Sequence, residues 1–136
     1  MGKFVIDKWA AAPEGLDPTR AAEFSKNAGN VNVGSRLVSE TERVRVWSLN
    51  LKPSERIGFH THVLDYFWTA LTGGQARSHY GDGRVAEVSY QPGDTQHHRF
   101  GPGEFMTHDL ENIGETELTF ITVEFKDSAN APLSVS

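Results

Sequence analysis

Short runs of strand-forming residues, each ended by a turn signal, constrain the fold of this chain more than any other feature. Eight such runs, rich in aromatic and β-branched residues or alternating in polarity, cover 43–51, 56–62, 66–71, 75–80, 84–90, 94–100, 105–110 and 118–125. Glycine- or proline-containing turns separate most of them. Eight or nine short strands with turn signals at about 8–12-residue spacing are typical of a sandwich or a barrel. The sequence therefore predicts an all-β fold.

The two ends of the chain differ from this pattern. Residues 1–30 contain turn formers and little periodicity, and Asp17 followed by Pro18 predicts the start of a helix of one or two turns. We interpret 1–30 as an irregular arm on the outside of the domain, either exchanged with a partner subunit or loosely held. Residues 31–126 are then the barrel, and the polar residues 127–136 are expected to fray.

Length, charge and cysteine content exclude several classes of function. The 136 residues are enough for one domain, and none of them is cysteine, which excludes disulfides, thiolate metal sites and a cysteine nucleophile. The net charge of −5 disfavours nucleic acid and anionic membranes as partners. No apolar run approaches the roughly 20 residues that cross a bilayer, and an acid interrupts the only apolar patch near the N-terminus. We therefore expect a cytoplasmic protein.

Two histidines one residue apart are the first candidates for chemistry. His60 and His62 lie in a run of strand-forming residues. Successive side chains on a strand point to opposite faces, so these two share a face, about 7 Å apart along the chain. Both rings can then reach one divalent metal. Without cysteine, the other ligands of such a metal must come from His, Asp, Glu, Tyr or Gln.

A third histidine, His108, is followed four residues later by Asn112 at the start of a turn. With its order of His-x-His, hairpins, Pro-Gly turn and His-x-x-x-Asn, the sequence over 31–126 resembles the cupin superfamily. That family has the patterns G-x5-H-x-H-x3–4-E-x6-G and G-x5-P-x-G-x2-H-x3-N, and it forms a double-stranded β-helix, a jelly-roll barrel. Gly73 stands at the last glycine of the first pattern and Gly93 at the first glycine of the second.

The resemblance implies a metal centre made of His60, His62 and His108. Neutral imidazoles suit Fe(II), Mn(II), Ni(II), Zn(II) or Cu(II), and the sequence does not choose among them. More narrowly, the His-Thr-His-Val-Leu-Asp-Tyr run at 60–66 looks like small single-domain bacterial cupins in catabolic gene clusters, including those linked to β-alanine breakdown.

The chain departs from the family pattern at the fourth ligand. Where the pattern has glutamate, this sequence has Tyr66, and strand alternation points the adjacent Asp65 away from the face of Tyr66. Ser54 replaces the first glycine. A three-histidine site completed by water or substrate would leave open positions, as catalytic metals need. Because phenol is a weak ligand at neutral pH, Tyr66 is expected to donate a proton or to orient the substrate.

A polar run at 96–99 precedes the Gly-Pro-Gly turn at 101–103. If this turn closes a three-residue hairpin, Gln96 lies opposite His108, whereas a four-residue loop puts His97 there, because a slip of one residue exchanges the two faces. We prefer Gln96 and His98 as pocket-lining residues, with His98 as a second group for proton transfer. The identity of any fourth ligand stays open among Tyr66, Gln96, His97 and His98.

The remaining polar and aromatic residues are given structural roles. His79 is expected at the surface, Asn112 is expected to fix its turn through its side chain, and Glu124 either faces inward or is solvated. The large aromatic residues are expected in the barrel core or a dimer interface; they are Trp47, Phe67, Trp68, Phe100, Phe105 and Phe120.

The function expected from these features is that of a metal-dependent enzyme. Such an enzyme would act on a small, oxygen-rich metabolite by isomerase, lyase or dioxygenase chemistry. The alternative is a non-catalytic barrel that binds a small ligand. A purely structural jelly roll is a third reading, because fold alone does not fix function. In each case the aromatic strands favour a homodimer.

Overall fold

Strands are the main regular secondary structure of the computed structural model, which describes residues 12–27 and 29–135. Within these ranges there are nine strands and one helix, and the predicted strands at 56–62 and 118–125 are reproduced without change. The elements are α2 (Pro18–Lys26), β1 (Arg36–Glu40), β2 (Val44–Leu51), β3 (Arg56–His62), β4 (Tyr66–Ala70), β5 (Gly74–His79), β6 (Val85–Tyr90), β7 (Thr95–His98), β8 (Met106–Asn112) and β9 (Leu118–Phe125).

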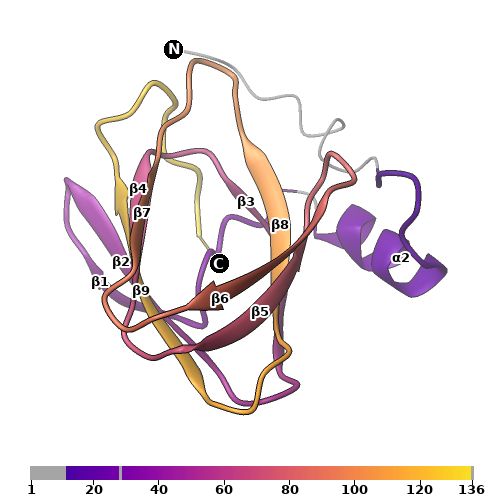
Figure 1. The fold of residues 1–136 in the computed structure, drawn as a ribbon. Helices are drawn as coiled ribbons and strands as arrows, with labels where there is room; N and C mark the ends of the chain where they lie inside the picture. Colours follow the sequence, from indigo (N-terminus) through magenta and orange to yellow (C-terminus); the bar gives the residue numbers. More distant parts are fainter. Residues whose placement is uncertain (1–11, 28, 136) are drawn as a thin grey trace.

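The strands form two antiparallel sheets that face each other (Figure 1). One sheet has the order β1-β2-β9-β4-β7 and the other the order β3-β8-β5-β6. Along β2 and β9, buried and less buried residues alternate, as expected for strands with one face toward a core. This arrangement confirms the predicted all-β double-stranded β-helix. Its apolar core contains Leu49, Leu51, Ala70, Ala76, Leu110, Leu118 and Phe120.

The predicted hairpin between the strands on either side of residues 101–103 is wrong. β7 pairs with β4 in one sheet, with His98 opposite Tyr66, whereas β8 pairs with β3 in the other. The Gly-Pro-Gly segment therefore carries the chain from one sheet to the other. Neither Gln96 nor His97 lies opposite His108, whose partner in the ladder is His60.

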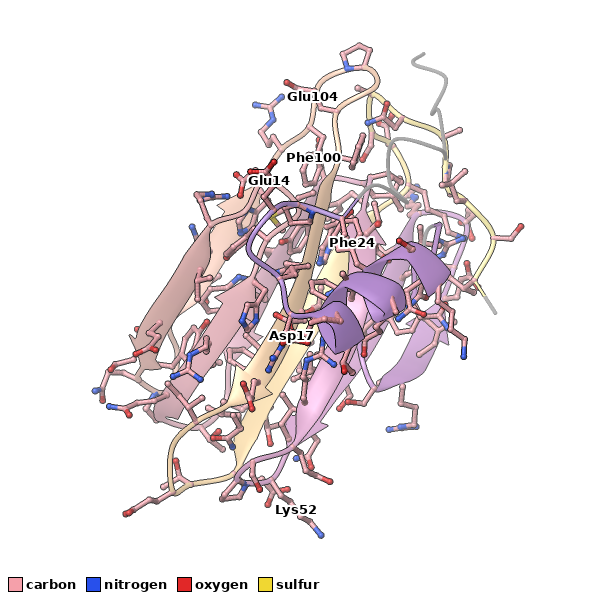
Figure 2. All side chains as sticks on the ribbon, turned by 90° about the vertical axis from the view of Figure 1, so that its right-hand side faces the viewer. Glu14, Asp17, Phe24, Lys52, Phe100 and Glu104 are labelled. Carbon is pink, nitrogen blue, oxygen red and sulfur yellow. The ribbon has the colours of Figure 1, made fainter. Side chains whose placement is uncertain are left out.

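The predicted short helix is confirmed as α2. Asp17 caps it by accepting a hydrogen bond at Oδ1 from the backbone N of Arg20 (2.9 Å), and Pro18 occupies its first position. α2 lies on the outer face of the sheet that contains β3 and β8 (Figures 1 and 2). Residues 1–11 and 28 of the predicted arm lie outside the described residues. No helix in the described part of the chain is long and apolar enough to span a membrane.

The prediction that residues 127–136 fray is wrong for the part that the structure describes. Asn130 is buried, and its Nδ2 donates to the carbonyl oxygens of Val63 and Gly101, both at 3.1 Å. Its Oδ1 accepts from the backbone N of Gly103 at 2.8 Å. Leu133 packs against buried apolar residues that include Val63. One buried amide thus ties the tail to the connection between the sheets.

The side chain of Asn112 fixes its turn, as predicted. Its Nδ2 donates to the carbonyl oxygens of Leu51 (2.9 Å) and Thr116 (2.8 Å), and its Oδ1 accepts from the backbone N of Gly114 (3.0 Å). Ser54, where the family pattern has glycine, has a φ of 68°, the left-handed region that glycine adopts most readily. The backbone at Ser54 thus has the conformation that a glycine would adopt at this position.

Candidate metal centre

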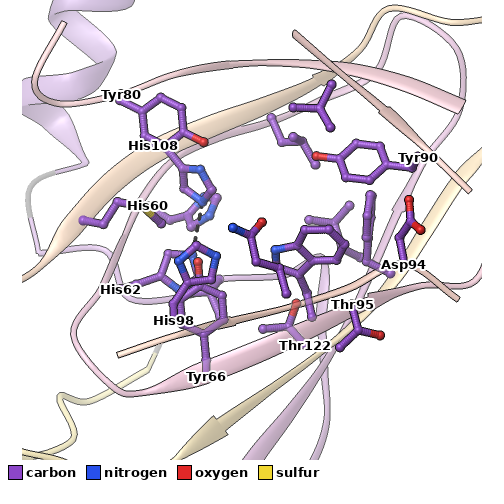
Figure 3. A pocket seen from close by; sticks show the side chains of 18 of the residues that line it. His60, His62, Tyr66, Tyr80, Tyr90, Asp94, Thr95, His98, His108 and Thr122 are labelled. Atoms are coloured by element: carbon purple, nitrogen blue, oxygen red, sulfur yellow. Dashed lines mark hydrogen bonds between the residues drawn. The ribbon is translucent and has the colours of Figure 1, made fainter. Parts of the chain in front are cut away.

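His60, His62 and His108 come together on the inner face of β3 and β8. His60 lies directly opposite His108 in the ladder, and His62 follows two residues later on the same face. Each offers a ring nitrogen, and the three nitrogens lie within 4.8 Å of one another. Figure 3 shows the three rings together at one end of a pocket, joined by a contact between Nε2 of His62 and Nε2 of His108 at 3.1 Å.

The hydrogen bonds of these rings fit a bound cation. Nδ1 of His60 contacts the carbonyl oxygen of Gly58 at 2.8 Å, so this nitrogen must carry the proton and Nε2 keeps a free lone pair. Metal–nitrogen bonds of about 2.1 Å place two ligand nitrogens about 3.0–3.4 Å apart, which includes the 3.1 Å contact. The Nδ1 atoms of His62 and His108 are buried without a hydrogen-bond partner in the described chain. The cluster therefore suggests a metal ion without indicating which.

Burial also keeps the three histidines neutral. It lowers the pKa of His60 to about 4, although the Gly58 carbonyl opposes this shift. Burial lowers the pKa of His62 and of His108 well below the usual value, and the neighbouring imidazoles add to the effect. At neutral pH all three rings thus present lone pairs, the form in which imidazole binds metal.

Tyr66 lies beside the cluster, at the position where the family pattern has glutamate. Its ring is stacked between those of His62 (centroids 4.1 Å apart, 15° between planes) and His98 (4.7 Å, 7°). Burial raises the pKa of Tyr66 well above its usual value, so the phenol stays protonated. No carboxylate joins the three histidines among the described residues. Tyr66 thus presents a proton donor where the pattern has a ligand.

The side chains of β7 divide between two faces. His98 and Gln96 line the pocket together with Tyr66, whereas the ring of His97 packs 5.3 Å from Phe67 on the opposite face. The preference for Gln96 and His98 as pocket residues agrees with this placement, although pairing with β4 produces it rather than the predicted hairpin. Burial and the neighbouring His97 lower the pKa of His98, which favours its neutral form.

The pocket has a volume of about 540 Å³ and two chemically different ends. One end carries the histidines and Tyr66, and the other includes the labelled Tyr90, Asp94 and Thr95 (Figure 3). Tyr90, Trp68 and Phe120 meet edge to face with centroids 4.9–5.5 Å apart. A volume in this range accommodates a small molecule.

Tyr80 and Arg84 are among the pocket residues that the sequence did not reveal, and His79, outside the pocket, was misplaced. Tyr80 and Arg84 line the pocket; the ring of Tyr80 lies 5.4 Å from that of His108, and the Arg84 guanidinium lies over Tyr80 at 4.4 Å. Tyr80 directly precedes the Gly-Asp-Gly turn at 81–83, a position that offers no motif. The prediction of a surface His79 is wrong, because this side chain is 14% exposed and contacts buried Asp109 at 3.2 Å.

Trp47 and Glu124 form a buried pair next to Tyr66, which lies opposite Glu124 in the β4–β9 ladder. Trp47 Nε1 donates to Glu124 Oε1 at 2.7 Å. Glu124, left open between an inward and a solvated position, is thus buried at 2% exposure. Burial raises its pKa to about 7.

Comparisons with known proteins were made for sequence and structure. No protein-family model matches the sequence, and no curated protein matches it. A cupin domain from Bordetella pertussis is similar in structure, with a TM-score of 0.59 and 24% identity over 67% of this chain and 90% of that one. A protein of Klebsiella pneumoniae with a double-stranded β-helix domain has a TM-score of 0.54 and 24% identity, covering 98% of this chain and 90% of that one.

An RmlC-like cupin-family protein of Methanocaldococcus jannaschii is also similar, with a TM-score of 0.53 and 18% identity over 66% of this chain and 76% of that one. At such identities the likeness shows the fold and leaves the activity open. The chain has the double-stranded β-helix fold of these cupin-domain proteins.

Proposed function

We propose that this chain is a metal-dependent enzyme that acts on a small, oxygen-rich metabolite. The observation that carries the proposal is the convergence of three neutral imidazoles, those of His60, His62 and His108, beside a protonated phenol at one end of a pocket. A bound divalent transition metal would supply Lewis acidity to a substrate oxygen or, as iron, chemistry with O₂. Isomerase, lyase and dioxygenase reactions all fit this arrangement.

The chain's own residues have separate parts in this proposal. Tyr66 holds a proton at its hydroxyl and can donate it to a developing oxygen anion, while neutral His98 can accept one. Gln96 can orient a substrate carbonyl or hydroxyl through its amide. The aromatic rings around Trp68 favour an apolar substituent on the substrate. The narrower resemblance to cupins of β-alanine breakdown is a substrate hypothesis within this proposal.

The alternative function is a barrel that binds a small ligand without turnover. It is favoured by the lack of a carboxylate at the cluster among the described residues, since a carboxylate is a common general base. Both functions share the metal. The two differ in whether a metal-loaded protein converts what it binds.

The test begins with metal analysis of protein purified without an affinity tag. We expect about one divalent metal per chain, lost in His60→Ala and His108→Ala and retained in His97→Ala, whose ring faces away from the pocket. The loaded protein is then incubated with diketones, hydroxy acids and keto-sugars. Turnover that disappears in His62→Ala supports the enzyme, and saturable binding without turnover supports the alternative. No metal above background in the wild type would refute both.

The proposal includes a homodimer and a cytoplasmic location. The dimer is proposed from the aromatic-rich strands, and the exposed apolar side chains that it would cover are among Val38, Leu71, Val85 and Phe125. Light scattering should give twice the chain mass of 15.1 kDa. A mass near that of one chain would contradict the dimer and leave the metal proposal intact.

A further inference from the structure

β3 contains a bulge immediately before the first metal-site histidine. In its ladder with β8, Ile57 lies opposite Leu110 and His60 lies opposite His108. Gly58 and Phe59 of β3 therefore face the single residue Asp109 of β8. A bulge of this kind bends its strand, leaves backbone groups outside the ladder and re-aims the side chains next to it.

α2 and the loop after it bind the backbone of the bulge from outside the barrel. Oε2 of Glu23 accepts from the backbone N of Phe59 at 3.3 Å. Nδ2 of Asn27 and Nδ2 of Asn30 each donate to the carbonyl oxygen of Phe59 at 3.2 Å. The ring of Phe24 meets the ring of Phe59 edge to face at 5.0 Å. Both polar groups of Phe59 are thus satisfied by the arm.

The other residue of the bulge, Gly58, connects these contacts to the metal site. A Cβ at Gly58 would lie 3.3 Å from Oε1 of Glu23, so the absence of a side chain at Gly58 provides the space that this carboxylate occupies. The carbonyl oxygen of Gly58 accepts from Nδ1 of His60 at 2.8 Å. Since this bond decides which ring nitrogen of His60 carries the proton, the shape of the bulge decides which nitrogen can bind a metal.

Ion pairs hold Glu23 in place. Arg56 donates to its two carboxylate oxygens at 2.7 and 2.6 Å, a two-pronged arrangement with good directionality. The Nε of Arg56 also donates to Asp109, the residue opposite the bulge, at 2.8 Å. The same arginine therefore ties the arm to both strands of the ladder that carries His60 and His108.

We propose that α2 is a clamp on the β3 bulge, and that Glu23, Asn27 and Asn30 are positioning residues for the metal site. They hold the Gly58 carbonyl where it keeps the proton of His60 on Nδ1 and directs Nε2 toward His62 and His108. None of the three touches the pocket. The tautomer of His60 can be measured without metal, so the clamp can be tested even if the proposed function fails.

The test uses nitrogen-15 spectra of the imidazoles in the metal-free protein, which distinguish a protonated ring nitrogen from a bare one. In the wild type we expect His60 to show Nδ1–H alone. In Asn27→Ala/Asn30→Ala and in Glu23→Ala the two nitrogen signals should move toward each other as both tautomers become populated. Glu23→Gln, which keeps an acceptor for the Phe59 amide, should restore much of the wild-type spectrum.

The matched control is Arg20→Ala. Arg20 is on the same helix and contacts Asp17 and, at 4.0 Å, Glu111 of β8, so its loss weakens the arm without touching the bulge. Its His60 spectrum should equal that of the wild type. If Glu23→Ala does not fold, Asn27→Ala/Asn30→Ala still decides, since it removes both side-chain donors to the Phe59 carbonyl and leaves Glu23 unchanged.

A Co(II) titration gives a second readout. Loss of an outer-sphere hydrogen bond typically lowers metal affinity about 10–100-fold, and we expect a loss of about tenfold in the double variant and none in Arg20→Ala. Folded variants with an unchanged His60 spectrum and unchanged Co(II) affinity would overturn the clamp. If the wild type binds no Co(II), the proposed function fails while the nitrogen spectra still accept or reject the clamp.

Discussion

The two faces of the β3–β8 ladder bury ionisable groups in opposite ways. On the inner face, burial lowers the pKa values of His60, His62 and His108, and no counter-charge joins them among the described residues. On the outer face Asp109 is fully buried and accepts from Arg56, whose pKa is raised above its usual value by its hydrogen bonds to Glu23. A buried group without a partner gives up its charge, whereas a paired group keeps it.

This difference separates residues that we expect to bind a ligand from residues that we expect to stabilise the fold. The inner face presents neutral donors that a cation can use, and two of its Nδ1 atoms lack partners. The outer face is crossed by ion pairs among its own residues, including those of Arg56 with Glu23 and Asp109. We therefore expect substitutions on the inner face to change ligand binding more than stability, and those on the outer face to do the reverse.

The largest predicted effect is on the free energy of unfolding, and it is tested by substituting two adjacent residues of β8. Asp109→Ala should lower the free energy of unfolding by about 3–5 kcal/mol, because it leaves Arg56 without its buried partner. His108→Ala should cost about 1 kcal/mol in metal-free protein, since it removes a buried imidazole with an unpartnered nitrogen beside an existing pocket. Urea unfolding in the presence of a chelator measures both. A larger loss for His108→Ala would contradict the separation.

Glu124 extends the comparison to a buried acid whose direct partner is a neutral indole. Burial raises its pKa from an ordinary 4.5 to about 7 in the folded chain. The folded state then binds more protons than the unfolded state between these values. The stabilising contribution of the protonated acid is complete below pH 4.5 and is lost as pH rises to 7.

Glu124→Gln should remove this pH dependence, because the amide can still accept from Trp47 and does not ionise. At pH 8 the variant should exceed the wild type in the free energy of unfolding by at most about 3 kcal/mol, a shift of one pKa unit being about 1.4 kcal/mol. At pH 4.5 the two should converge. If the curves of unfolding free energy against pH for the wild type and Glu124→Gln run parallel from pH 4.5 to 8, the pKa of Glu124 is not raised by burial.

Local pattern predicted eight of the nine strands in the described chain and the shared face of His60 and His62, whereas β1 was missed and His108 was added by the family resemblance. The alternation in 118–125 and the turn residues that follow 43–51 act over a few positions, so they are visible in the sequence. The same holds for His60 and His62, whose shared face follows from strand geometry alone. Asp17 and Pro18 likewise specify the start of α2 within two residues.

Long-range pairing lay beyond prediction. Which strand accompanies β7 depends on contacts with β4, and the hairpin rule for a short turn gives the wrong partner. The bulge at Gly58 and Phe59 forms against Asn27 and Asn30, which are about 30 residues away in the chain. The buried Asn130 has no periodic signal. Each of these features depends on two distant segments meeting, which no local residue pattern encodes.

The two faces of β4 offer a smaller test of the same separation, at the end of the pocket that contains Trp68. Trp68 lines the pocket, and Phe67 beside it packs on the other face. Phenylpyruvate and pyruvate are two keto acids that differ only in a phenyl group. In Co(II)-loaded protein, Trp68→Leu should weaken the binding of phenylpyruvate about tenfold, near 1.4 kcal/mol, and leave the binding of pyruvate unchanged. Phe67→Leu should change neither. Equal weakening of both acids by Trp68→Leu would show that the aromatic end does not contact the substituent.

The smallest predicted effect concerns Tyr66 as a ligand. Tyr66→Phe keeps the ring between those of His62 and His98 and removes only the hydroxyl, which burial keeps protonated. A protonated phenol does not coordinate a divalent cation, so Co(II) affinity should change by less than about threefold, or 0.6 kcal/mol. His62→Ala, which removes one of the three donors, provides the contrast in the same titration. A loss of Co(II) affinity above about tenfold in Tyr66→Phe would show that the phenol is a fourth ligand, because this substitution keeps the stacked ring and removes only the hydroxyl.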